Sequence, residues 1–161
     1  MKHAPGEDRI AERLAAGVLS REGFLGSDRR PLREIIDADG SAVERLGLTH
    51  EAVAARLAEA LVASTAAMGA PVELGGDLMA VHHEAMGRIA CPWGGGLLFP
   101  KGEVELTDRS TGRTVRFSPL SVHLIGEHGF YQGRGSRYRL DPEVVCDMLK
   151  LGRGRQHGEE P

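Results

Sequence analysis

The amino-acid sequence predicts an α+β fold, in which N-terminal helices pack on a small antiparallel sheet and further helices lie at the C-terminal end. The chain changes character near Gly69–Pro71. Before this point it is rich in alanine, leucine, arginine and glutamate. After it come glycines, β-branched residues and six of the seven aromatic side chains, all between Trp93 and Tyr138. Because aromatic rings contribute large buried areas, we expect the core to form around the second half, with the helices packed onto it.

Length and composition indicate one domain. The chain has 161 residues, of which 41% are hydrophobic and 27% charged, as is typical of a globular protein that buries its own core. We expect a single domain over residues 1–152, with a helical half at 7–68 and a β-rich half at 71–152, and a disordered tail at 153–161. A net charge of −3 gives no long-range attraction to nucleic acid, so such binding would need a local basic patch.

Two helices are predicted before residue 41. Apolar residues recur at helical spacing from about Glu7 to Ser20, which predicts the first helix. Pro31 suits the first turn of a second, short helix, and the pair Asp39-Gly40 is typical of a helix end. The sequence therefore predicts that this second helix ends at about Asp39-Gly40.

Two more helices are predicted between residues 41 and 69. Ser41, with Glu44 three residues later, matches a capping box and predicts a brief helix that Gly47 ends. Thr49 then suits the N-cap of a longer helix, whose apolar stripe runs toward Met68.

The clearest β structure is a hairpin. Residues alternate in character over Glu103–Thr107 and again over Arg113–Phe117, and a turn-rich five-residue loop joins the two runs. The segment Leu78–Cys91 fits both a strand and a helix by its apolar spacing. The glycines around it favour strands.

Two helices are predicted in the C-terminal quarter of the chain. Pro119 stops the hairpin's second strand, and a helix follows over about Leu120–His128, which Gly129 ends. Asp141 caps a final helix with Pro142 at its first position.

Cysteine usage and the shortness of the apolar runs indicate a cytoplasmic protein. Cys91 and Cys146 lie far apart with no CxxC spacing, and Met1–Arg9 contains no apolar signal segment. The apolar runs fall well short of the about 20 residues that a membrane-spanning helix needs. We therefore expect a reducing compartment and no membrane partner.

Histidine and cysteine residues suggest a zinc site, because thiolate and imidazole together suit this ion. The candidate ligands are His82, His83, Cys91, His123 and His128. His82 and His83 are adjacent and point in different directions on a strand or a helix, so we expect one of them at most to bind. His123 and His128 diverge by about 140° on a regular helix, and we expect them to share an ion only if the helix unwinds near Gly126. The alternative is that all five are ordinary packing or surface residues.

A second candidate site is the basic loop that follows the histidines. Its arginines, glycines and flat rings suit an anionic ligand such as a phosphate or single-stranded nucleic acid. The candidate ligand-binding residues are Trp93, Tyr131, Arg134, Arg137, Tyr138 and Arg139. The alternative is a surface turn whose rings pack inward and whose arginines are solvated.

The sequence therefore predicts a small cytoplasmic binding protein with a zinc ion at the junction of Cys91-Pro92-Trp93, the His123–His128 helix and the Arg134–Arg139 loop. The first alternative is a phosphate- or nucleic-acid-binding module that uses this loop. The second is an enzyme with Cys91 or a histidine as its reactive group. A binding protein is favoured over an enzyme, and no catalytic residue, substrate or oligomeric state is predicted.

Overall fold

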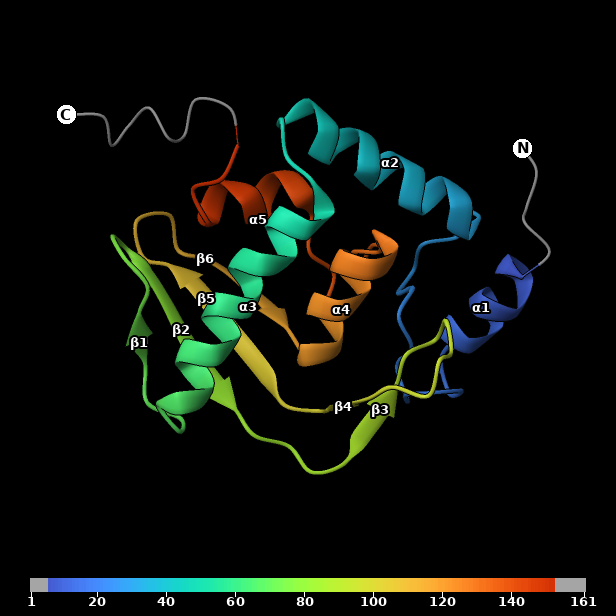
Figure 1. Ribbon diagram of the computed structural model, residues 1–161, viewed down its shortest axis with the longest axis horizontal. Helices are drawn as coiled ribbons and strands as arrows, with labels where there is room; N and C mark the ends of the chain where they lie inside the picture. The colour runs from blue at the N-terminus through green and yellow to red at the C-terminus, as the bar shows by residue number, and fades with distance from the viewer. Residues whose placement is uncertain (1–5, 153–161) are drawn as a thin grey trace.

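The computed structural model describes residues 6–152 and confirms the predicted α+β class, with five helices, a four-stranded antiparallel sheet and a separate two-stranded sheet within that range (Figure 1). The helices are α1 (Glu7–Leu14), α2 (Leu32–Arg45), α3 (His50–Ala66), α4 (Pro119–His128) and α5 (Pro142–Met148). The strands are β1 (Val72–Glu73), β2 (Leu78–His83), β3 (Arg88–Ala90), β4 (Leu98–Pro100), β5 (Glu103–Asp108) and β6 (Arg113–Phe117). None of these helices is long and apolar enough to cross a bilayer.

The main sheet has the strand order β1-β2-β5-β6, with every neighbouring pair antiparallel. Burial alternates along β5, so Val104 and Leu106 face the core while Glu105 lies on the other side. Helices α3 and α5 cover the core-facing side (Figure 1), where Leu57 and Met148 join the sheet residues in one apolar cluster.

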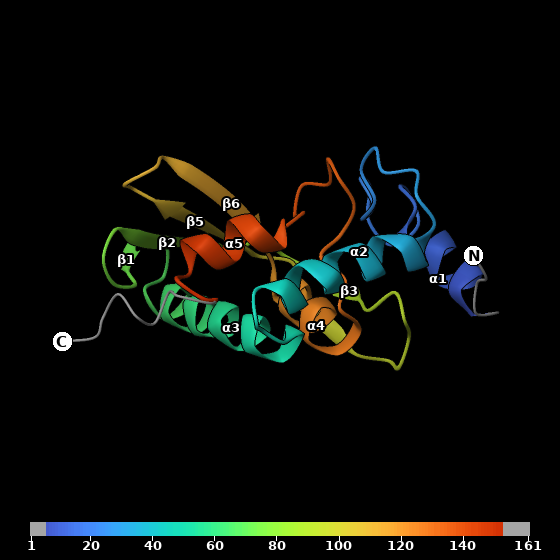
Figure 2. The ribbon, with the colours of Figure 1, turned by 90° about the horizontal axis from the view of Figure 1, so that it is seen from above.

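A second apolar cluster lies at the other end of the molecule, where α1 and β3 are found (Figure 2). It contains Phe24, Cys91 and Phe130, far from one another in the chain. Helix α4 separates the two clusters, because Leu124 packs in the second cluster and Ile125 in the first. This position brings one side of α4 against Cys91.

The helix ends in the first half differ from the prediction. Helix α2 runs unbroken through Asp39 and Gly40, so the predicted helix end there, and the separate helix that Ser41 was expected to cap, are both wrong. Asp39 is buried in an ion pair with Arg139, 100 residues away, which stabilises a helical residue that local propensity disfavours.

The first helix also ends earlier than predicted, at Leu14 instead of near Ser20. The chain folds back on itself there, and the Phe24 N–H donates to the Leu14 carbonyl at 2.9 Å. A Cβ atom on Gly23 would lie 2.8 Å from that carbonyl oxygen, and its φ of 76° is in the left-handed region, so glycine is required for this return.

Several local predictions are confirmed. Thr49 caps α3 through its hydroxyl, which accepts from Ala52 N at 3.1 Å. Gly129 ends α4 in the left-handed conformation, and the Asp141 carboxylate caps α5. The predicted hairpin is β5–β6, and the ambiguous segment forms β2 and β3 as favoured. The tail predicted at 153–161 lies outside the described residues.

Candidate metal centre

The Cys91 side of the site is a tight turn directly after β3. The Gly94 N–H donates to the Cys91 carbonyl at 2.9 Å, and Pro92 at the second turn position has the φ that such a turn needs. The backbone N–H groups of Trp93 and Gly94 lie beside the Cys91 sulfur and act to lower the pKa of its thiol. Arg13 of α1 donates to the Pro92 carbonyl at 2.6 Å and holds the turn against the second cluster.

The other two groups come from α4. His123 and His128 lie five residues apart, yet their ring centroids are 5.4 Å apart with the planes at 77°. The helix remains regular from Pro119 to His128, so the expectation that it must unwind near Gly126 is wrong. Side chains on a helix lean toward its N-terminus, so the ring of His128, the last helical residue, reaches back over the turn that contains His123.

The three groups converge. The Cys91 Sγ lies 3.7 Å from the His128 Nε2, and one ligand atom from each of Cys91, His123 and His128 lies within 4.8 Å of the others. A tetrahedral zinc ion, with Zn–S of about 2.3 Å and Zn–N of about 2.0–2.1 Å, would place sulfur and nitrogen about 3.5 Å apart. The three residues are therefore close enough to hold a metal ion with small side-chain adjustments.

Aromatic rings surround the group. Trp93 stacks on His128 with centroids 4.3 Å apart and planes at 9°, and Phe99 lies 4.8 Å from the ring of His123. Cys91 is only 3% exposed. Burial raises the pKa of the Cys91 thiol, against the opposing effect of the two backbone N–H groups. Burial, together with the neighbouring His123, lowers the pKa of His128.

No family model, curated protein or solved structure matches this chain. The interpretation of the site therefore rests on its own geometry.

The remaining candidate ligands, His82 and His83, lie on β2 and are not part of the Cys91 group. His83 is exposed, and its Nε2 lies 3.0 Å from the Glu105 carboxylate across the sheet. His82 lines a hollow beside the end of α3 with Thr65 and Met68. The structure thus brings three of the five candidate ligands together.

The glycines of the basic loop have a packing role. A Cβ on Gly133 would lie 2.3 Å from the Leu25 carbonyl oxygen, and one on Gly26 would lie 2.4 Å from the Arg134 carbonyl oxygen. Two hydrogen bonds join these segments, from Gly133 N to the Phe24 carbonyl and from Ser27 N to the Arg134 carbonyl, each 2.9 Å. Close contact between two backbones explains glycine here without any ligand.

Most donors of the loop are already bonded. The backbone N–H of Arg134 donates a hydrogen bond to the Asp28 carboxylate. The Arg137 guanidinium group donates two hydrogen bonds to the Glu103 carboxylate. The Arg139 guanidinium group likewise donates two hydrogen bonds to the Asp39 carboxylate. The Tyr138 hydroxyl donates to Glu103, and Tyr131 is buried with its hydroxyl 2.9 Å from the His50 ring. Trp93, the remaining candidate ligand-binding residue, stacks on His128 of the Cys91 group instead of lying beside this loop. Nucleic-acid binding by this loop stays a prediction, and its geometry does not favour it.

Sequence inspection overlooked two parts of the site. Phe99, on β4, covers His123 but lies in a segment with no other chemical signal. The backbone donors of Trp93 and Gly94 were also missed, although a cysteine followed by proline and, two residues on, by glycine is a turn pattern that points amides at the sulfur.

Proposed function

We propose that this protein binds a zinc ion through the Cys91 sulfur and the imidazoles of His123 and His128. The observation that supports this best is the 3.7 Å separation of Cys91 Sγ and His128 Nε2, close to the spacing of two ligands on one tetrahedral zinc ion. Mixed thiolate and imidazole donors suit zinc better than calcium or magnesium, which prefer oxygen.

The turn that carries Cys91 suits a bound thiolate. Metal-bound sulfur carries negative charge, and the N–H groups of Trp93 and Gly94 already face it. N–H groups placed in this way would stabilise the charge of a metal-bound thiolate.

The pKa shifts argue against a reactive thiol and are compatible with a metal ligand. A nucleophilic cysteine works as a thiolate beside an imidazolium, which requires a low thiol pKa and a protonated histidine. Here burial moves both groups the opposite way, raising the pKa of Cys91 and lowering that of His128. A neutral imidazole is the form that binds metal, and a zinc ion would displace the thiol proton.

The described residues supply three ligands, and a water molecule or a small bound molecule would complete the tetrahedron. Sites with three protein ligands and one exchangeable position are typical of zinc ions that interact with a further molecule, whereas purely structural sites have four protein ligands. Trp93 and Phe99 flank the site with flat apolar surfaces. We therefore infer a binding protein whose zinc ion is accessible to a ligand.

Elemental analysis of the purified protein, expressed without a histidine tag, tests the proposal. We expect about one zinc ion per chain, lost in Cys91→Ser and in His128→Gln. Cobalt substitution gives a second readout, because a cobalt–thiolate bond produces a charge-transfer absorption that Cys91→Ser would abolish.

Two variants serve as matched controls. Cys146→Ser removes the other buried free cysteine, and His83→Gln removes an exposed histidine outside the group. Both should retain the full zinc content. The proposal would be wrong if the wild-type protein took up no zinc from micromolar solution, or if the controls lost zinc as readily as the ligand variants.

A further inference from the structure

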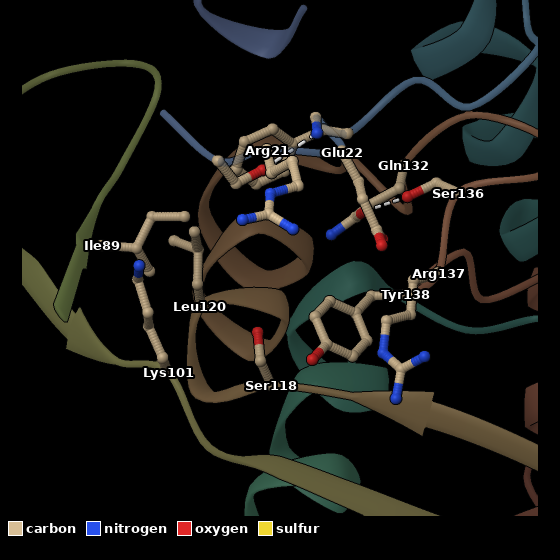
Figure 3. Close-up of a pocket in the computed structure, with 13 residues that line it drawn as sticks. Arg21, Glu22, Ile89, Lys101, Ser118, Leu120, Gln132, Ser136, Arg137 and Tyr138 are labelled. Carbon is tan, nitrogen blue, oxygen red and sulfur yellow. Dashed lines mark hydrogen bonds between the residues drawn. The ribbon is translucent and has the colours of Figure 1, made fainter. Parts of the chain in front are cut away.

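A second, separate hollow of about 220 Å³ lies between the loop after α1, the strand β3 and the segment that follows α4 (Figure 3). Its apolar wall includes Phe24, Ile89 and Leu120, which belong to or pack against the same cluster as Cys91. An apolar cavity of about 150 Å³ is known to hold benzene, so this volume accommodates a ring with a short chain attached.

Gln132 is the most unusual residue of the lining. It is only 3% exposed and its φ is 71°, a left-handed conformation that costs a non-glycine residue about 1 kcal/mol or more. Its Oε1 accepts a hydrogen bond from the Ser136 hydroxyl at 2.5 Å. No described residue accepts from its Nε2, which faces the hollow in Figure 3. The amide nitrogen is thus a free donor at the surface of the hollow, held in place by a nearly buried residue on a strained backbone, and it is available to a ligand.

Arg21 supplies a charge on the same hollow. Its guanidinium group points inward in Figure 3, and it forms no ion pair with any residue between 6 and 152. The loop that carries it is held by the Gly23 N–H, which donates to the Ser20 hydroxyl at 3.0 Å. Among the lining residues Glu22 is the one acid, against three basic side chains, of which Arg137 is already paired with Glu103.

We propose that this hollow binds a small organic acid, with its carboxylate between the Arg21 guanidinium and the Gln132 amide nitrogen. The apolar body of the ligand lies on Phe24, Ile89 and Leu120. The two donors, one of which is charged, match the two oxygens of a carboxylate. The apolar wall disfavours a highly charged polyanion such as nucleic acid inside the hollow, because burial of its charges would be costly. This site is independent of the proposed zinc site.

The probe for the test is 3-phenylpropanoate, with the neutral 3-phenylpropanamide as its matched control. Both have the same apolar body, and they differ in the charge and acceptors of the head group. Titration of ¹⁵N-labelled full-length protein should shift the amide signals of the segments around Arg21 and Gln132. We expect the acid to bind at least about tenfold more tightly than the amide, the effect of one charge-assisted contact.

Two variants separate a binding role from a structural one. Arg21→Gln should weaken binding of the acid about tenfold and leave binding of the amide unchanged. Gln132→Gly removes the donor, and relief of the left-handed strain offsets part of the stability lost with the buried side chain, so we expect weaker binding by a protein that is still folded at the assay temperature. Arg134→Gln, which changes an exposed arginine of the same loop outside the lining, should have no effect.

Equal affinity for acid and amide, or unchanged affinity in Arg21→Gln or Gln132→Gly, would overturn the proposal. Zinc content, measured on the same samples, should be unaffected by these two variants. A wild-type protein that holds zinc but does not bind the probe therefore counts against this site alone, and a wild-type protein that binds the probe but takes up no zinc counts against the metal site alone.

Discussion

The ion pair between Asp39 and Arg139 joins α2 to the segment that carries Gln132. Its two contacts measure 2.5 Å and 3.1 Å, and the side chains are 8% and 14% exposed. Arg139 also donates to the Gln132 carbonyl at 2.9 Å. The change Asp39→Ala would leave a buried guanidinium group with a weak second partner, the Asp141 carboxylate at 3.8 Å.

Removal of one partner of a buried pair costs about 3–5 kcal/mol in the free energy of unfolding. Because Asp141 compensates part of the charge, we expect about 3 kcal/mol for Asp39→Ala. For a chain of this size each kcal/mol lowers the melting temperature by about 2–4 °C, so the expected drop is about 6–12 °C. Replacing both charges, in Asp39→Ala with Arg139→Met, leaves no unpaired charge and should recover at least about half of the loss.

Urea unfolding followed by far-ultraviolet circular dichroism measures these differences. Asp37→Ala is the control on the same helix, because Asp37 is exposed and its contact with Arg33 is a surface pair, expected to be worth less than about 1 kcal/mol. The reasoning is refuted if Asp39→Ala loses no more than the control, or if the double variant is no more stable than Asp39→Ala.

Three further predictions concern stability and pH. Tyr131→Phe removes a buried hydroxyl 2.9 Å from His50 and should cost about 1 kcal/mol in thermal unfolding; no loss would show that the contact is not stabilising. Hydrogen bonds from Arg30 hold the pKa of Asp28 well below its usual value. The ionised Asp28 carboxylate therefore stabilises the folded state at neutral pH, and this contribution is lost as the pH falls below about 4. In Asp28→Asn the free energy of unfolding should decrease less steeply over this acid range. Because the pKa of the Cys91 thiol is raised, zinc binding should release the thiol proton. Calorimetry should then show an apparent zinc affinity that increases about tenfold per pH unit at pH values below that pKa. An affinity that does not change with pH would contradict this prediction.

Much of the local structure could be predicted because short-range chemistry specifies it. The hydroxyl of Thr49, the carboxylate of Asp141 and the glycine after His128 act on backbone groups only a few residues away, and all three end or begin helices as expected. The pair Asp39-Gly40 shows the limit of such reasoning. These two residues locally favour a helix end, but the ion pair of Asp39 with Arg139 keeps them helical. Arg139 lies 100 residues away, so local sequence patterns do not indicate this partner.

The sequence by itself determined the α+β class, the hairpin, most helix ends and the short list of metal-binding side chains, because each depends on residue type and on neighbours within one or two turns of chain. Only the tertiary structure decided which of those side chains meet. Cys91 and His128 are 37 residues apart, and they converge because α4 packs between two apolar clusters and turns its histidines toward the end of β3. Such convergence depends on how whole elements pack, and long-range packing leaves no periodic signal in the residues that it brings together.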